Sequence, residues 1–241
     1  MKSYLKKNFH FWNRKYFTPN VEGFIFRLKP YLLDKYIKFK KKKFEILDFG
    51  CGEGSNVIFF EKNYKFIPYG VDISSDSIRK CKSKCKKYKN NFKVINPKPN
   101  INDDFFNKKF DLIISTQTLY FLSDVDLKKR LISLRNLLKP NGFVYFTMKT
   151  TKHIYWSKCS NKKKDSDGLT LVNLNKLNKN LNYKKRQKLN TYVHYINFTR
   201  SEKELKEKLK MFKKLNIGYY DLSLHDTKSS SHHYTFFGKK A

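Results

Sequence analysis

Three glycines at alternate positions, preceded by an acid, form the stretch of this sequence best suited to bind a ligand. Asp48, Gly50, Gly52 and Gly54 give the spacing D-x-G-x-G-x-G within residues 44–56, FEILDFGCGEGSN. A glycine backbone can turn sharply and come close to a ligand because no Cβ stands in the way. The loop therefore suits a phosphate or another polar ligand, and a tight structural turn is the alternative that needs no ligand.

A second acid narrows the choice of ligand. Dinucleotide-binding loops space their glycines G-x-G-x-x-G, whereas here the third glycine follows after one residue, and Asp48 and Glu53 would repel a phosphate. A ligand with a cationic amine and a sulfonium tolerates both acids. Asp72 ends the run at residues 66–72, FIPYGVD, and an acid at the end of the strand after a glycine loop can accept both hydroxyls of a ribose. For Asp72 taken alone, a helix cap at the end of the strand is the alternative.

The sequence around these residues alternates between strand-like and helix-like segments. An apolar stripe of Leu127, Leu131, Leu134 and Leu138 predicts one of the helices. Alternating strands and helices indicate a parallel sheet with helices on its faces. The predicted strands are 46–49, 66–72, 91–95, 110–115, 143–148, 217–224 and 234–238, and helices are expected to start at Ser55, at Ser74 or Ser75, at Ser123 or Asp124, and at the capping box Ser201–Glu204.

With these motifs the chain resembles the class I S-adenosylmethionine-dependent methyltransferases, nearest the group that acts on small molecules. The resemblance rests on the glycine loop, on Asp72 and on the phrase LLKPNGFVYF at residues 137–146, and it covers residues 46–148 well. It implies an α/β, Rossmann-like fold with a seven-stranded, mostly parallel sheet flanked by helices and an antiparallel C-terminal strand. It also implies S-adenosylmethionine as the cofactor.

We expect a single methyltransferase domain over residues 1–241. It would comprise an N-terminal helical arm (1–43), a cofactor-binding core (44–148), a substrate-cover insertion (149–200), and a C-terminal helix and hairpin (201–241). The arm would fold over the cofactor, or would simply pack on the core. The insertion follows the fifth strand and so leaves the catalytic edge, which favours a cover over a decorative loop.

The resemblance assigns roles to the residues of the glycine loop and of the strand ends. Asp48 would meet the cationic amine of the cofactor, directly or through water, or would only orient the turn, and Asp72 would take the ribose hydroxyls. Asp103 is an alternative to Asn96 near the adenine. The expected cofactor-binding residues are Asp48, Gly50, Cys51, Gly52, Gly54, Asp72, Ile73, Asn96, Ser115 and Gln117.

Residues that act on the methyl acceptor are expected where the fourth strand ends, at residues 115–120, and in the insertion. His153 and His194 are candidate bases because histidine titrates near neutral pH, and Tyr120 could hydrogen-bond the acceptor. Each of the three could instead be a packing residue. Residues 115–118, STQT, lack the proline-rich motif of enzymes that methylate exocyclic amines of bases. No metal-ligand spacing stands out, so we expect no metal site.

Net charge adds an expectation about partners. The 241 residues include 53 Lys+Arg and 20 Asp+Glu, a net charge of +33. Such a charge attracts nucleic acid, an anionic membrane or phosphorylated small molecules, although over-use of lysine and asparagine throughout the chain is the alternative explanation. No apolar run is long enough for a membrane span, and four cysteines without a disulfide framework indicate a cytoplasmic protein.

These observations favour methyl transfer to a small, polar, anionic metabolite such as a sugar or a phosphorylated precursor. Residues 181–224 weakly resemble the C-terminal parts of methyltransferases linked to surface-glycan precursors. An RNA methyltransferase is the first alternative, because it would explain the charge more directly. A non-catalytic binding module on a methyltransferase core is the second.

Overall fold

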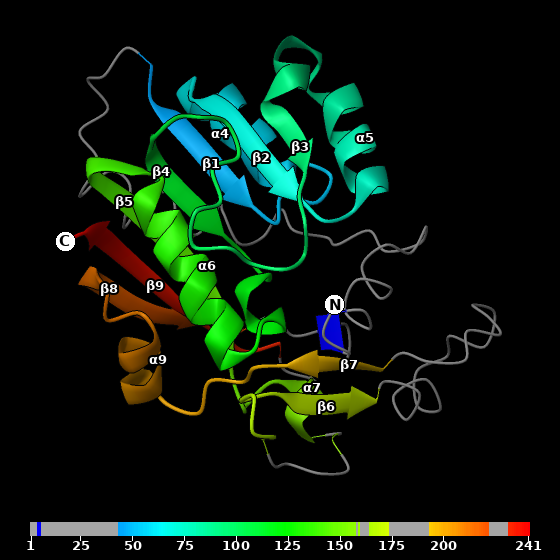
Figure 1. Cartoon of the computed structure of the whole chain (residues 1–241), viewed down its shortest axis with the longest axis vertical. Coiled ribbons are helices and arrows are strands. Elements are labelled where there is room, and N and C mark those ends of the chain that lie inside the picture. Colours follow the sequence, from blue (N-terminus) through cyan, green and yellow to red (C-terminus); the bar gives the residue numbers. More distant parts are fainter. Residues whose placement is uncertain (1–3, 6–42, 158, 160–163, 174–192, 222–230) are drawn as a thin grey trace, which may run out of the picture.

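A seven-stranded sheet in the order β3-β2-β1-β4-β5-β9-β8 organises the protein. The computed structural model describes residues 4–5, 43–157, 159, 164–173, 193–221 and 231–241 (Figure 1). The strands are β1 (Glu45–Phe49), β2 (Ile67–Asp72), β3 (Phe92–Val94), β4 (Phe110–Ser115), β5 (Leu138–Lys149), β8 (Phe212–Tyr220) and β9 (His233–Lys240). Strands β3, β2, β1, β4 and β5 pair in parallel, and β9 runs antiparallel to both of its neighbours. The predicted fold class is therefore confirmed.

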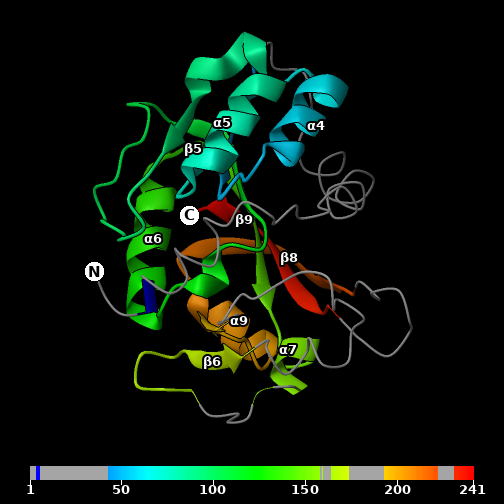
Figure 2. The same cartoon turned by 90° about the vertical axis from the view of Figure 1, so that its right-hand side faces the viewer.

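Helices cover both faces of this sheet. They are α4 (Ser55–Tyr64), α5 (Ser75–Lys84), α6 (Asp124–Asn136) and α9 (Glu202–Lys208), with the short α7 (Ile154–Ser157) and the 3-10 turns η2 (Lys86–Asn91) and η3 (Leu119–Phe121). Figure 2 places α4 and α6 on opposite sides of the sheet. Layers of this kind bury the apolar residues of a parallel sheet on both faces.

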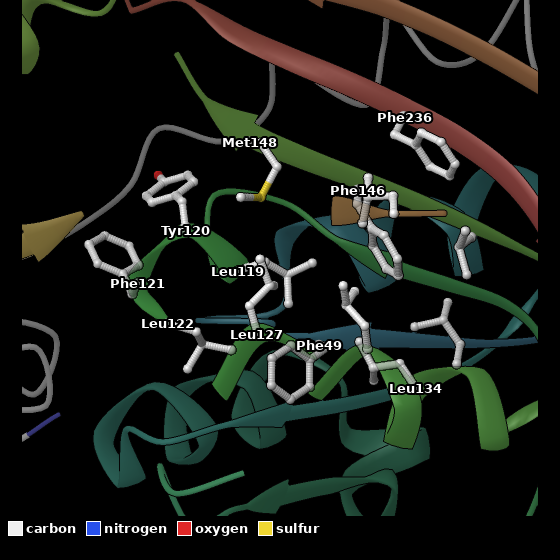
Figure 3. Close-up of a cluster of buried hydrophobic side chains, with 14 of the residues drawn as sticks. Phe49, Leu119, Tyr120, Phe121, Leu122, Leu127, Leu134, Phe146, Met148 and Phe236 are labelled. Carbon is white, nitrogen blue, oxygen red and sulfur yellow. The ribbon is translucent and has the colours of Figure 1, made fainter. Parts of the chain in front are cut away.

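The apolar stripe of α6 forms part of the largest buried cluster. Leu127, Leu131 and Leu134 pack with Phe146 and Met148 of β5, on one face of the sheet (Figure 3). On the other face, Phe60 of α4 belongs to a second cluster that includes Ile46, Ile114 and Tyr145. These two cores hold the strands in place, so the positions of the strand ends are fixed.

Serine side chains begin three of the helices as N-caps. Ser74 Oγ accepts from Ser77 N and Ser123 Oγ accepts from Asp126 N, so the structure selects the first of the two predicted starts in each case. The third cap is that of α9, where Ser201 Oγ accepts from Glu204 N. Each cap satisfies one of the free N–H groups of its helix.

The starts of two strands differ by five residues from the sequence prediction. The fifth strand was expected at 143–148 and Leu138 in the preceding helix, but β5 starts at Leu138, which pairs with Phe110, so the residues KPNG at 139–142 lie within the strand. The register then shifts, and Phe143 pairs with Leu112. The other difference is β8, which starts at Phe212 rather than at residue 217, since α9 has ended at Lys208.

The insertion has secondary structure of its own. It contains α7 and a separate two-stranded sheet of β6 (Thr170–Asn173) and β7 (Val193–Ile196). The predicted arm at 1–43 lies outside the described residues, except for its positions 4, 5 and 43. Tyr4 is buried there, and its hydroxyl donates to Asp126 of α6. No helix in the described part of the chain combines the length and the apolar character needed to cross a bilayer.

Candidate functional site

The glycine loop leaves β1 at the carboxyl edge of the parallel strands, the edge where open α/β sheets bind their ligands. The backbone N–H groups of Gly50 and Cys51 both donate to Val71 O, at 2.8 and 3.0 Å. These two bonds tie the loop to the end of β2. The loop and Asp72 are thereby held next to each other, as the sequence predicted.

The three glycines of the loop serve different purposes. All three have positive φ angles, at +80° for Gly50, +52° for Gly52 and +84° for Gly54. A Cβ on Gly50 would collide with Thr118 and one on Gly54 with Cys81, whereas a Cβ on Gly52 would meet no atom within 4 Å. The first and third glycines are thus required by packing. The second faces open space and leaves room for a ligand against the backbone.

Asp48 is a buried carboxylate without a partner in the described part of the chain. Its side chain is 0% exposed, and neither carboxylate oxygen accepts a hydrogen bond there. Burial raises the pKa of Asp48 to about 7; the nearby amide of Asn56 lowers this pKa and the negative charge of Asp72 raises it. Buried acids without donors are costly. A ligand that brings a cationic amine would supply the missing donors, so this observation fits S-adenosylmethionine.

Asp72 ends β2 and holds the loop in place. One carboxylate oxygen accepts from Gly52 N at 2.9 Å and the other from Ser74 N at 2.8 Å. Burial raises its pKa, and these backbone N–H groups oppose that rise. A carboxylate oxygen can accept more than one hydrogen bond, so both oxygens can still receive hydroxyls. Asp72 therefore binds local backbone N–H groups, whereas Ser74 caps the helix, and Asp72 remains suited to a ribose.

Two hydrogen bonds join the end of β4 to its neighbours. Ser115 Oγ donates to Phe49 O at 2.9 Å, which links β4 to β1. Gln117 N donates to Thr147 Oγ1 at 2.8 Å, which links the exit of β4 to β5, and Gln117 has a φ of +56°. Ser115 is buried and Gln117 is half-buried. Of the two, Gln117 is the one with a side chain partly open to solvent.

Three further predicted residues lie around the loop in less direct positions. Cys51 is buried in a cluster with Ile78 and Phe92, so its side chain packs below the loop. Ile73 is half-buried directly after Asp72. Asn96 is exposed, and its Oδ1 accepts from Lys98 N at 2.9 Å.

Asp103, the alternative to Asn96, forms an ion pair with a residue of α6. Its carboxylate accepts from the buried Arg130 of α6, with 2.7 Å between Oδ2 and Nη1. The Arg130 guanidinium also lies over the rings of Phe49 and Phe105. Asp103 therefore has a structural partner already.

Tyr120 follows β4 and His153 follows β5 at this edge. Tyr120 is 1% exposed and packs beside Phe121 at one end of the large cluster (Figure 3). Both ring nitrogens of His153 have partners: Nδ1 accepts from Tyr155 N at 3.0 Å, and Nε2 lies 3.1 Å from Ser231 Oγ. His153 must give up one of these bonds before it can take a proton from an acceptor. His194 lies in β7, paired with Val172, and its side chain falls outside the described part of the structure.

Lys149 is a buried residue of this edge that the sequence did not reveal. It ends β5, is 5% exposed, and its Nζ lies 4.7 Å from the ring centroid of Tyr120 and 4.3 Å from that of Tyr155. Its position directly after Met148, at the end of a predicted strand, was the available signal. In a chain with 53 Lys+Arg, one more lysine does not stand out. Among the described residues, no group of three or more His, Cys, Asp or Glu could hold a metal ion.

Comparisons with known proteins agree with this geometry. Residues 46–142 match a family model described as a methyltransferase domain. The fold is shared with the PH0226 protein of Pyrococcus horikoshii (20% identity, TM-score 0.63, covering 93% of this chain and 92% of that one). It is also shared with S-adenosylmethionine-dependent methyltransferases of Methanosarcina mazei (18%, 0.61, 86% and 96%) and Clostridium acetobutylicum (18%, 0.59, 87% and 89%). Comparison with curated proteins finds no match.

The matched domain contains the glycine loop, Asp72 and the exit of β4, and the observed strand order completes its fold. The chain therefore carries a methyltransferase domain at residues 46–142 and shares the fold of S-adenosylmethionine-dependent methyltransferases. The acceptor of the methyl group is a separate question.

Proposed function

We propose that the protein transfers a methyl group from S-adenosylmethionine to a small, polar, anionic metabolite in the cytoplasm. A sugar or a phosphorylated precursor is the kind of acceptor we expect. The observation that carries the cofactor side is the unpartnered Asp48 beside the open backbone of Gly52. The anionic acceptor is supported by the net charge of +33, and the cytoplasmic location by four cysteines that form no disulfide.

In the proposed site each acid has a separate task. S-adenosylmethionine, when bound, supplies an activated methyl group for an in-line displacement. Asp48 holds the cationic amine and Asp72 holds the ribose hydroxyls, while the backbone at Gly52 lies against the cofactor. No side chain caps the N-terminus of α4, so its first-turn N–H groups are available to the carboxylate of the cofactor. The protein contributes position and exclusion of water rather than covalent chemistry.

The remaining predicted residues complete the proposal. Gly50, Cys51, Gly54 and Ser115 shape the loop and the strand ends, and Ile73, Asn96 and Gln117 line the adenosine side. His153, His194 and Tyr120 remain the candidates for handling a proton of the acceptor. Residues 149–200 form the cover over the acceptor.

The test is to incubate the protein with methyl-labelled S-adenosylmethionine and a cell extract divided into RNA, protein and small-metabolite fractions. We expect label only in the small metabolites. Label in the RNA fraction would replace the proposal by the RNA methyltransferase alternative, which the positive charge also favours. Failure of the purified protein to bind the cofactor would support the non-catalytic alternative.

Asp72→Ala tests the ribose assignment by calorimetric titration of S-adenosylmethionine. We expect binding at least about tenfold weaker, since two hydroxyls lose a charged acceptor. Asp76→Ala is the matched control, because Asp76 is an acid of the next helix that pairs with Arg79 on the surface. Equal binding by wild type and Asp72→Ala would remove the ribose assignment.

A further inference from the structure

Strand β5 is longer than its neighbour β4 at the catalytic edge. Ser115, the last residue of β4, pairs with Phe146, whereas β5 continues to Lys149. Thr147 accepts from Gln117 N at the exit of β4, and Lys149 follows it by two residues on the same face of the strand. Lys149 therefore stands above the end of β4, on the acceptor side of the loop.

The walls around Lys149 come from four elements. Tyr120 of η3 and Tyr155 of α7 place their rings against its Nζ. In the sheet, Lys149 pairs with His233 of β9, which pairs in turn with Tyr220 of β8. Directly opposite residues point to the same face, so these three side chains form one row. Among the described residues, His153 also faces the row, and its ring centroid lies 5.4 Å from that of His233. His232 lies on the opposite face, stacked on Tyr219 and with its Nδ1 2.9 Å from Thr150 Oγ1.

No carboxylate of the described residues forms an ion pair with Lys149, although eleven other ion pairs occur there. The two rings compensate the ammonium charge only in part, because a cation–π contact is weaker than an ion pair. Burial accordingly lowers the pKa of Lys149 to about 7. A buried amine without a counter-charge is unfavourable for folding, and a ligand with an acidic oxygen would remove that deficit.

We propose that Lys149 binds an acidic oxygen of the methyl acceptor, a carboxylate or a phosphate, and so selects anionic acceptors. This inference rests on the proposed function, and it adds the residue that recognises the charge. Tyr120 and Tyr155 hold the amine in place, and the acceptor approaches from the side that the rings leave open. Near neutral pH the amine takes up a proton as the anion binds.

Three variants test the proposal. Lys149→Met removes the charge and keeps most of the bulk, Lys149→Arg keeps the charge, and Lys152→Met removes a lysine that is exposed three residues away. For Lys149→Met we expect KM for the acceptor that is labelled in the small-metabolite fraction to rise about 30-fold or more, as when one partner of a buried charge pair is lost. The methylated product of that acceptor should itself be retained on an anion exchanger. The affinity for S-adenosylmethionine should stay unchanged.

Lys149→Arg should recover part of the lost affinity, and Lys152→Met should behave as wild type. If Lys149 were only structural, Lys149→Met would lower the cofactor affinity and kcat as well as raise KM. That result would contradict the proposal. A neutral product, or equal KM for wild type and Lys149→Met, also overturns it. Treatment of the product with a phosphatase distinguishes the two sources of the anion, because only a phosphate loses its charge.

A second measurement separates this inference from the proposed function. Inorganic phosphate and benzoate are titrated by calorimetry into the protein saturated with S-adenosylhomocysteine, at about pH 8. Two buffers of different ionisation enthalpy are used, because the difference between them reports proton uptake. We expect one of the two anions to bind with proton uptake in wild type but without it in Lys149→Met. If neither anion shows binding that depends on Lys149, the inference fails even if methyl transfer is found. If no extract fraction gains label, the proposed function fails while this result still decides the role of Lys149.

Discussion

The stability of the fold and the proposed binding of the cofactor favour different protonation states of the Asp48 carboxyl group. Its carboxylate is fully buried without a hydrogen bond in the described part of the chain, a state that normally lowers stability. The folded pKa of about 7 lies above the unfolded value of about 3.9. Between these values the folded state holds a proton that the unfolded state has lost, so this group makes folding less favourable as pH rises from about 4 to about 7.

Replacement of this acid by its neutral amide should therefore stabilise the protein. For Asp48→Asn we expect the free energy of unfolding at about pH 8 to rise by about 1–3 kcal/mol, with little change at about pH 4. Urea titrations at both pH values measure it. A loss of stability at the higher pH would show that Asp48 has a stabilising partner.

The same variant should bind the cofactor poorly. In the proposed site the ionised carboxylate holds the cationic amine, so the affinity of wild type for S-adenosylmethionine should rise with pH up to about 7 and then level off. Calorimetric titration across that range should show this rise for wild type and a weaker, flat profile for Asp48→Asn. A flat profile in wild type would contradict the assignment of Asp48 to the amine.

The glycines of the loop offer a matched pair of substitutions. Gly52→Ala should fold with a cost of about 1–2 kcal/mol from its positive φ, because its methyl group meets no atom within 4 Å. The added methyl fills the space against the backbone, so cofactor affinity should fall about tenfold or more. Gly50→Ala, which collides with Thr118, should instead lower stability further. Thermal melting and calorimetry separate the two effects, and full cofactor affinity in Gly52→Ala would place the ligand elsewhere.

At the scale of elements, the N-cap of helix α6 shows how a buried cap contributes to stability. Ser123 is buried, its Oγ accepts from Asp126 N, and the Tyr4 hydroxyl lies 3.2 Å away. Loss of a cap costs about 1–2 kcal/mol in such surroundings and about 0.5–1 kcal/mol on the surface. We expect Ser123→Ala to lower the free energy of unfolding more than Ser201→Ala, the exposed cap of α9. Urea unfolding measures both, and equal losses would mean that the contact with Tyr4 adds nothing.

The sequence revealed the elements whose signal is local. The glycine loop, Asp72 and the stripe of α6 each depend on spacing within one short segment, and each was predicted. The start of β5 was missed because KPNG is typical of a turn, while the pairing of Leu138 with Phe110 that keeps it in the strand is a contact between distant segments. Lys149 was missed for the same reason, because its importance depends on Tyr155, His233 and the end of β4 meeting around it.

At the scale of the whole molecule, the net charge of +33 predicts weak binding to nucleic acid of any sequence. We expect affinity for a random single-stranded RNA to fall by a factor on the order of 10³ between about 50 and about 200 mM salt, through counterion release. Fluorescence anisotropy with a labelled oligonucleotide measures this. Methyl transfer to the small acceptor should change far less over that range, because the Lys149 contact is buried and therefore poorly screened. RNA binding that persists at high salt would favour an RNA substrate.

The part of β5 that extends beyond the end of β4 separates two functions along the chain. In the proposed site, binding of the methyl donor depends on the first half of the chain, through β1 and β2, whereas choice of the acceptor depends on the end of β5 and on the antiparallel strands β9 and β8. Evolution could thus exchange the latter while the former stays intact. Grafting the final third of a related enzyme onto this protein should redirect methylation to a new compound without altering how the methyl source is held.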